Sequence, residues 1–161
     1  MEIGSRHPAL APPPDDPAGE TPGLVVLGGD ECRTLLRQHS LGRVGFVVDG
    51  WPVVLPVNYA MDGDDIVVRT DQATKLAAGT HWSVPVVLEV DAALTFFEPG
   101  WSVLAHGIAV EVRDEAEIRR LGKLGLEPWA GGTRNQWIRI RVVQVTGRRL
   151  TGEHRFPESW H

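Results

Sequence analysis

The sequence has little cysteine and no long apolar run. Cys32 is the only cysteine among 161 residues, so one chain cannot form an internal disulfide or a metal centre built from several of its own thiolates. Scarce cysteine is typical of reducing compartments, and we expect a cytoplasmic protein. No apolar segment approaches the about 20 residues that a membrane helix needs. The Pro-rich, polar N-terminus also lacks the apolar centre of a signal peptide, so no membrane association is expected.

Positive charge and recognisable catalytic motifs are also scarce. The chain has 16 Lys and Arg against 21 Asp and Glu, a formal net charge of −5, which argues against broad attraction to nucleic acid or anionic membranes. The six histidines show no metal-ligand spacing, and we expect no metal site. The Gly-Gly pairs form no dinucleotide-binding fingerprint, and no serine nucleophile elbow is present. Catalytic side chains therefore cannot be named.

Composition divides the chain into three parts. Residues 1–23 are rich in proline and lack periodic apolar residues, which predicts a disordered or extended tail. Residues 24–150 have the apolar patterning and length of one domain, and residues 151–161 are expected to form a second tail.

Alternating apolar residues predict a mainly β domain with short helices. The turn signals Asp49-Gly50 and Asp62-Gly63 join the first three strands into a meander, which requires an antiparallel sheet. A small sheet of this kind tends to curl into a barrel, which removes its edges. Gly107, inside a strand, indicates a bulge or a close backbone contact. The predicted strands are 43–48, 53–60, 66–70, 84–91, 101–112 and 136–146.

Three short helical segments accompany the strands. Asp30 is the expected N-cap of a helix whose residues Cys32, Leu35, Leu36 and His39 recur at helical spacing and would face the core. Residues 71–79 have the length of one or two helical turns. Asp114 and Glu117 have the spacing of a capping box, which starts a helix that should end near residue 122. Cys32 itself is interpreted as a small buried apolar residue rather than a nucleophile.

Pro56 is the unusual residue of the second strand. Proline donates no backbone hydrogen bond, so it belongs at a strand edge or a bulge. A break there would leave backbone groups of Leu55, Val57 and Asn58 able to bond the rim of a planar heterocycle. The alternative is an edge strand that the proline protects against aggregation.

A cluster of donors follows the third strand. Arg69, Thr70, Thr74 and Lys75 offer the guanidinium, ammonium and hydroxyl groups that bind a phosphate. The alternative is an ordinary solvated surface. Tryptophan is common around flat ligands and at interfaces, and Trp101 and Trp129 lie in Gly-rich loops, although core packing is the default for any single tryptophan.

Taken in order, these motifs resemble the pyridoxamine 5'-phosphate oxidase-like, FMN-binding split β-barrel family, and within it the proteins that are named for that oxidase but distinct from it. The resemblance runs from about Leu27 to Leu150. The matching segments are residues 32–36, 42–45, 56–59, 62–63, 69–70, 74–75, 89–91, 100–103, 107–109, 128–129 and 146–148.

The resemblance implies an antiparallel split β-barrel that forms a homodimer with FMN at the subunit interface. It further implies that backbone around Leu55, Pro56, Val57 and Asn58 contacts the flavin ring, and that Arg69, Thr70, Thr74 and Lys75 hold the phosphate. Ser102, beside Trp101, would reach the ring, and the partner chain would contribute the loop around Trp129. The implied activity is that of an FMN-dependent oxidoreductase acting on a small molecule.

Two departures narrow this expectation. The segment Ala73-Thr74-Lys75 lacks one cationic partner relative to the oxidase, and the basic C-terminal segment of true pyridoxamine phosphate oxidases is not recognisable. Oxidation of vitamin B6 is therefore not expected. Relatives of this fold bind FMN, the deazaflavin F420 or haem. The alternatives are thus an F420-dependent reductase, a non-catalytic flavin- or haem-binding module, and a structural dimer without a ligand.

Overall fold

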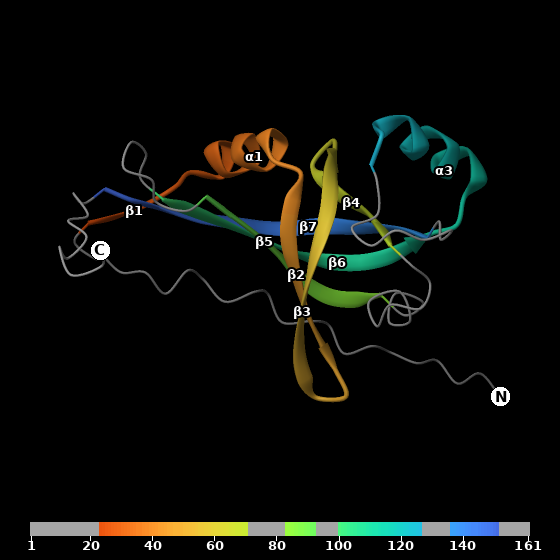
Figure 1. Ribbon diagram of the computed structural model, residues 1–161, viewed down its shortest axis with the longest axis horizontal. Coiled ribbons are helices and arrows are strands. Elements are labelled where there is room, and N and C mark those ends of the chain that lie inside the picture. The colour runs from red at the N-terminus through yellow and green to blue at the C-terminus, as the bar shows by residue number, and fades with distance from the viewer. Residues whose placement is uncertain (1–22, 71–82, 93–99, 127–135, 152–161) are drawn as a thin grey trace, which may run out of the picture.

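The computed structural model describes residues 23–70, 83–92, 100–126 and 136–151, which form one closed antiparallel sheet with short helices (Figure 1). Both predicted tails, except Gly23 and Thr151, lie outside the described residues, as does the expected helix at 71–79. The elements are β1 (Leu24–Val26), α1 (Gly29–Gln38), β2 (Leu41–Val48), β3 (Trp51–Asp62), β4 (Asp65–Thr70), β5 (Val84–Ala92), β6 (Trp101–Val112), α3 (Glu115–Leu121), the 3-10 helix η2 (Gly122–Leu124) and β7 (Gln136–Leu150).

The strand order confirms the predicted split barrel. The sheet runs β1-β7-β4-β3-β2-β5-β6, and β6 pairs again with β7, which closes the ring. The long β7 makes this possible, because one edge pairs with β6 while the other pairs first with β4 and then with β1. β1 was not predicted, since three residues are too few to show alternation.

The β2–β3 hairpin projects beyond the rest of the barrel (Figure 1). Its turn residues Asp49 and Gly50 have φ angles of 51° and 81°. Positive φ at both central positions defines the type I′ turn, whose twist matches that of paired strands, and Asp-Gly is one of its preferred sequences. The predicted bulge is also present, because the β6–β7 register shifts between His106 and Gly107.

The main core fills the barrel, and α1 closes one end of it. Cys32, Leu35 and Leu36 of α1 are buried as predicted, whereas His39 is exposed just beyond the helix. The buried Tyr59 hydroxyl donates a 2.8 Å hydrogen bond to the Leu36 carbonyl, which ties α1 to β3. A second, smaller core lies between the barrel and α3 and consists of Val67, Val112, Leu121, Leu126 and Trp137.

One helix start was predicted correctly and one was not. The Asp114 side chain accepts a 2.7 Å hydrogen bond from the Glu117 backbone N–H, as expected for the N-cap of α3. Helix α1 instead begins at Gly29 with Gly28 as its N-cap. Asp30 therefore lies in the first turn, where the helix dipole also favours a carboxylate.

Candidate functional site

One outer face of the barrel gathers several of the predicted site residues. Tyr59 and Val68 lie opposite each other and point into the core. The next residues on the two strands, Asn58 and Arg69, therefore point outward, because side chains alternate along a strand. Pro56 shares this outer face, since it lies two residues from Asn58 on β3.

One edge of β3 pairs with β2, and the second, open edge of β3 offers backbone hydrogen-bonding groups. The Tyr59 N–H donates to the Ser40 carbonyl at 2.8 Å. The antiparallel alternation then directs the backbone groups of Leu55 and Val57 toward β2, and those of Val54 and Pro56 away from it. Between residues 51 and 57 no strand of the described chain pairs with this open edge.

Two parts of the Pro56 prediction were wrong. β3 runs through Pro56 without a break, because the proline lies where its missing N–H would point away from β2. Because the backbone groups alternate between the two edges, those on the open edge belong to Val54 and Pro56, and not to Leu55 and Val57.

Arg69 is held against the smaller core. Its Nη1 donates a 3.3 Å hydrogen bond to the Leu126 carbonyl, and its guanidinium carbon lies 5.7 Å from the centre of the Trp137 ring. A cation over an indole face is stabilised by the charge distribution of the ring. Thr70, by the same alternation, points to the other side of β4.

The first of two adjoining pockets lies beside Pro56 and the end of α1. It has a volume of about 540 Å³ and is lined by Gln38, His39, Ser40, Leu41, Gly42, Arg43, Pro56 and Asp91. His39 Nδ1 lies 2.8 Å from the Leu35 carbonyl, so this nitrogen carries the proton. The His39 ring also meets Trp101 edge-on, with 4.8 Å between ring centroids. These two contacts fix its orientation.

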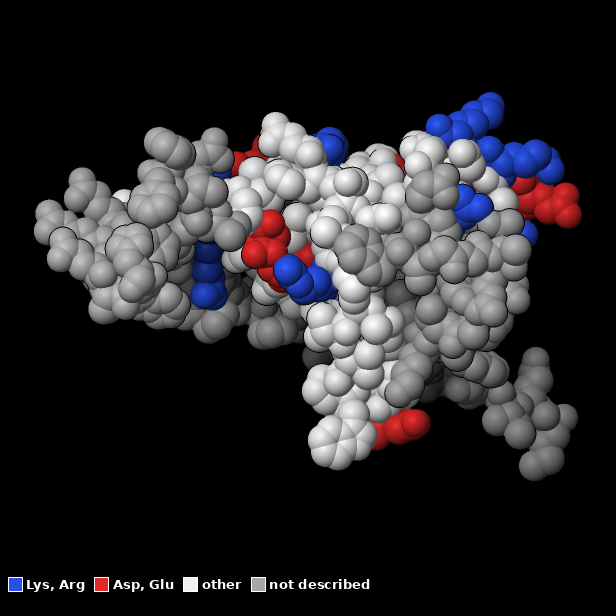
Figure 2. Space-filling view, viewed as in Figure 1, with Lys and Arg blue, Asp and Glu red and all other residues white. Residues whose placement is uncertain are grey.

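An ion cluster forms one wall of this pocket. Arg43 Nη1 donates to Glu89 at 3.0 Å and to Asp91 at 2.6 Å. These hydrogen bonds, the one to Asp91 foremost, raise the pKa of Arg43 above its ordinary value. Figure 2 shows acidic and basic atoms side by side near the centre of the view. From the sequence alone, the alternation of Glu89 and Asp91 on one strand fits a solvated face as well as a pair of acid-base groups, and it does not predict their contact with Arg43.

The second pocket adjoins the first at Asp91. Its volume is about 400 Å³, and its lining comprises Leu24, Glu89, Asp91, Ala92, Gly100, Trp101, Ser102, Arg148, Arg149 and Leu150. Asp91, Ser102 and Arg148 occupy neighbouring positions on β5, β6 and β7. The predicted residues Trp101 and Ser102 thus reach the same pair of pockets as Pro56.

Arg69 and Thr70, the predicted phosphate residues that the structure describes, lie at the opposite end of β7 from Trp101 and Ser102. Thr70 pairs with Gln136 at the start of β7, whereas Ser102 pairs with Arg148 near its end. About 40 Å of strand separates these two positions at roughly 3.3 Å per residue. Along β7, one chain therefore does not bring Arg69 and Thr70 together with Trp101 and Ser102. Thr74, Lys75 and Trp129 lie outside the described residues.

The closed ring of antiparallel strands and the pockets on its outer face define the protein as a split β-barrel with a surface cleft. Residues 29–149 match the family model described as pyridoxamine 5'-phosphate oxidase, and the chain belongs to this family. An uncharacterized protein of Mycobacterium tuberculosis is 31% identical over 138 residues, which cover 83% of this chain and 90% of the relative.

Two solved structures share the fold at similar identity. A candidate pyridoxamine 5'-phosphate oxidase from Corynebacterium glutamicum is 28% identical with a TM-score of 0.67, covering 83% of this chain and 98% of its own. The FAD-binding protein from Mycobacterium smegmatis is 32% identical with a TM-score of 0.65, covering 78% of this chain and 97% of its own.

Proposed function

We propose that this protein is a homodimeric, flavin-binding oxidoreductase that holds FMN at the subunit interface. The observation that carries the proposal is the outer face on which the open edge of β3 lies beside Arg69, in a chain that belongs to this family. Bound flavin would supply the redox chemistry, while the protein supplies position and electrostatics. The substrate would be a small molecule, and the protein would act in the cytoplasm.

The residues available fit a flavin in two respects. The backbone groups of Val54 and Pro56 face the open edge of β3, within or next to the predicted ring-binding segment Leu55–Asn58, and suit the alternating acceptors and donors of the ring rim. Arg69 carries a planar fork of N–H donors on the same outer face, and this geometry matches the oxygens of a phosphate. Thr70, Thr74 and Lys75 remain the predicted further phosphate contacts.

The separation of the predicted phosphate residues from the predicted ring contacts Trp101 and Ser102 favours a site shared between subunits. Arg69 and Thr70 lie at one end of β7, and Trp101 and Ser102 at the other. A second copy, placed with its β7 reversed, would bring the Trp101 group of one chain near the Arg69 group of its partner. Trp129 remains a predicted contribution of the partner chain.

The cofactor itself is open among several related molecules. FMN is the proposal, and FAD is supported as an alternative by the name of the M. smegmatis relative, which binds FAD. F420 would require a more basic groove than a net charge of −5 favours. Within the part of the chain that the structure describes, no helix is long and apolar enough to span a membrane.

Titration of the purified, ligand-free protein tests the proposal. Riboflavin, FMN, FAD, F420 and haem are added separately, and binding is followed by absorbance and fluorescence. We expect FMN to bind, and Arg69→Gln to weaken its binding about 10- to 100-fold, since a hydrogen bond to a charged group contributes about 1.5–3 kcal/mol. Arg141→Gln, an exposed arginine on β7, is the matched control and should bind FMN like the wild type.

Three outcomes would contradict the proposal or part of it. No flavin binding would remove the proposed function. Selective binding of F420 or haem would replace the cofactor. If the flavin-loaded protein neither accepts electrons from a reduced nicotinamide nor passes them to an added quinone, the protein is a non-catalytic binding module rather than an oxidoreductase.

A further inference from the structure

The predicted phosphate residue Arg69 is supported by residues that would not touch the ligand. Its guanidinium lies over Trp137, whose side chain is 3% exposed, and donates to the carbonyl of Leu126. Trp137 and Leu126 both belong to the smaller core, and Leu126 lies two residues beyond Leu124, the last residue of η2. The orientation of Arg69 thus depends on where that segment lies.

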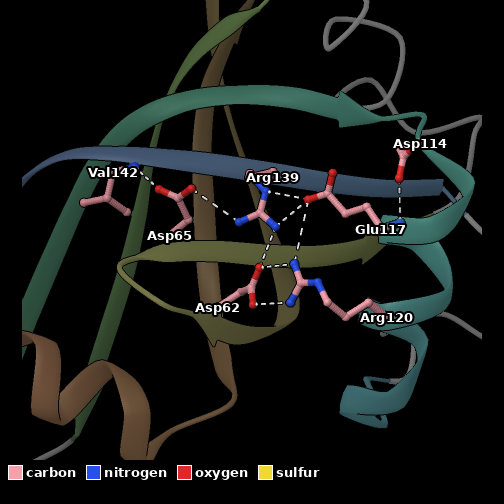
Figure 3. Close-up of polar contacts among 7 residues, drawn as sticks. All are labelled: Asp62, Asp65, Asp114, Glu117, Arg120, Arg139 and Val142. Carbon is pink, nitrogen blue, oxygen red and sulfur yellow. Dashed lines mark hydrogen bonds and ion pairs between the residues drawn. The ribbon is translucent and has the colours of Figure 1, made fainter.

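A network of charged side chains fixes α3 to the barrel (Figure 3). Arg139 of β7 contacts Glu117 of α3 at 2.6 Å and Asp65 of β4 at 3.3 Å, with its own side chain only 13% exposed. Arg120 of α3 makes two hydrogen bonds to Asp62, of 2.7 and 2.8 Å. Arg139 binds the same Asp62 carboxylate of β3, so the network joins α3 to β3, β4 and β7.

The bidentate pair of Arg120 and Asp62 restricts both side chains, because two parallel N–H···O bonds define the plane and the direction of the guanidinium. Glu117 has a second restraint, since its backbone N–H is bound by Asp114 at the helix start. Helix α3 is therefore tied to the barrel at Glu117 and at Arg120, the latter one residue before the buried Leu121 of the smaller core.

We propose that the α3–η2 segment is a positioning element of the anion site: the ion network holds α3, α3 and the smaller core hold Trp137 and the Leu126 carbonyl, and these orient Arg69 toward a phosphate. This inference rests on the proposed function. Pre-orienting a guanidinium lowers the entropy lost when an anion binds. Because coupling between two equilibria is reciprocal, a bound phosphate also stabilises the docked position of α3.

The test compares FMN with riboflavin, which has the same ring but no phosphate. In the wild type we expect FMN to bind more tightly. Arg120→Gln removes both bonds to Asp62 from an exposed side chain, and it should reduce the ratio of riboflavin Kd to FMN Kd about fivefold while leaving the riboflavin Kd unchanged. The matched control is Arg119→Gln, the preceding residue, which forms an exposed 3.6 Å pair with Glu115 of its own helix.

A second pair of variants examines the contact nearest to Arg69. Trp137→Leu removes the aromatic face and should lower the same ratio, whereas Trp137→Phe keeps an aromatic face and should retain most of it. A merely structural defect would weaken both flavins equally, so the ratio separates loss of positioning from loss of fold.

Hydrogen exchange of the α3 amides supplies a readout independent of affinity. We expect faster exchange in Arg120→Gln, and slower exchange in the wild type with FMN than with riboflavin. Unchanged exchange in Arg120→Gln would overturn the role of the ion network, and an unchanged Kd ratio despite faster exchange would overturn the coupling to Arg69. Equal wild-type affinity for FMN and riboflavin would overturn this inference and the phosphate contact of Arg69 but not flavin binding, whereas no flavin binding would overturn the proposed function as a whole.

Discussion

At the scale of single residues, the packing of α1 against the barrel depends on a glycine. A Cβ atom on Gly147 of β7 would lie 2.7 Å from the Cys32 sulfur and 3.2 Å from Leu27 Cδ1. Cys32 is fully buried, and this burial raises the pKa of its thiol. The thiol therefore stays protonated, and it acts as a small apolar group that fits only because residue 147 has no side chain.

Gly147→Ala should consequently destabilise the fold by about 1–3 kcal/mol, as expected for overpacking in a tight core. Denaturant unfolding followed by circular dichroism measures the change. Cys32→Ala in the same chain removes the sulfur and should recover part of the loss. Gly122→Ala is the control, since a Cβ atom added there would meet nothing within 4 Å and its φ of −56° suits any residue. Equal effects of Gly147→Ala with and without Cys32 would show that the sulfur is not the obstacle.

For single residues, burial could be predicted from the sequence, but contacts between distant residues could not. The burial of Cys32 was predictable, because helical spacing places it with Leu35 and Leu36 on one face. The hydrogen bond from Arg69 to the Leu126 carbonyl was not predictable, because the two residues lie 57 positions apart in sequence. The contact of Arg43 with Asp91 spans 48 positions and depends on the pairing of β2 with β5, which local periodicity does not reveal.

At the scale of elements, α3 is held more by charge than by apolar area. Only Leu121 of its seven residues is buried. Hydrogen bonds from Arg120 and Arg139 keep the pKa of Asp62 well below its usual range, while Asp65 and Glu117 also face Arg139. Glu117 has the spacing of a capping box, yet its carboxylate binds Arg139, so the sequence predicted its position but not its partner.

Asp62 should therefore contribute stability that depends on pH. A carboxyl group whose folded pKa is lowered stabilises the fold fully above its unfolded pKa of about 3.9, and this stabilisation is lost as the pH falls further. Asp62→Asn should cost about 1–3 kcal/mol at pH 7, and the difference from the wild type should shrink below about pH 4.

Unfolding by urea at pH 7, 5, 4 and 3 measures this difference. Asp64→Asn is the matched control in the same turn, because its side chain is 77% exposed and its pairs with Arg33 and Arg37 should contribute little. A difference between wild type and Asp62→Asn that stays constant down to pH 3 would contradict the assigned pKa direction.

The elements that alternate most clearly were also the ones predicted best. β2, β5 and β6 lie within about two residues of their expected bounds, because each has a buried and an outer face. β7 extends to Leu150, four residues beyond the expected end, since pairing with the unpredicted β1 and with β6 continues it. Tertiary pairing, rather than local sequence, sets that boundary.

At the scale of the whole molecule, the projecting β2–β3 hairpin exposes large apolar side chains on both of its faces, Val47 and Val54 on one and Trp51 on the other. Val47, Trp51 and Val54 are 63%, 76% and 62% exposed. In Figure 2 this projection is white apart from acidic atoms near its tip. Large exposed apolar side chains that cluster on one element are typical of protein interfaces. The hairpin is thus the strongest candidate for contact with the second copy in the proposed homodimer.

Trp51→Glu should convert the dimer to a monomer, because a carboxylate would replace the largest apolar side chain of that contact and would be buried without a partner. Sedimentation velocity measures the assembly state. The thermal midpoint of the isolated chain should change little, since Trp51 makes no part of either core. Leu124→Glu, at a 43% exposed leucine of η2, is the control and should remain dimeric.

If flavin sits between subunits, Trp51→Glu should also lose flavin binding. A monomer that still binds FMN with wild-type affinity would place the whole site within one chain, and a dimeric Trp51→Glu would exclude the hairpin as the essential contact.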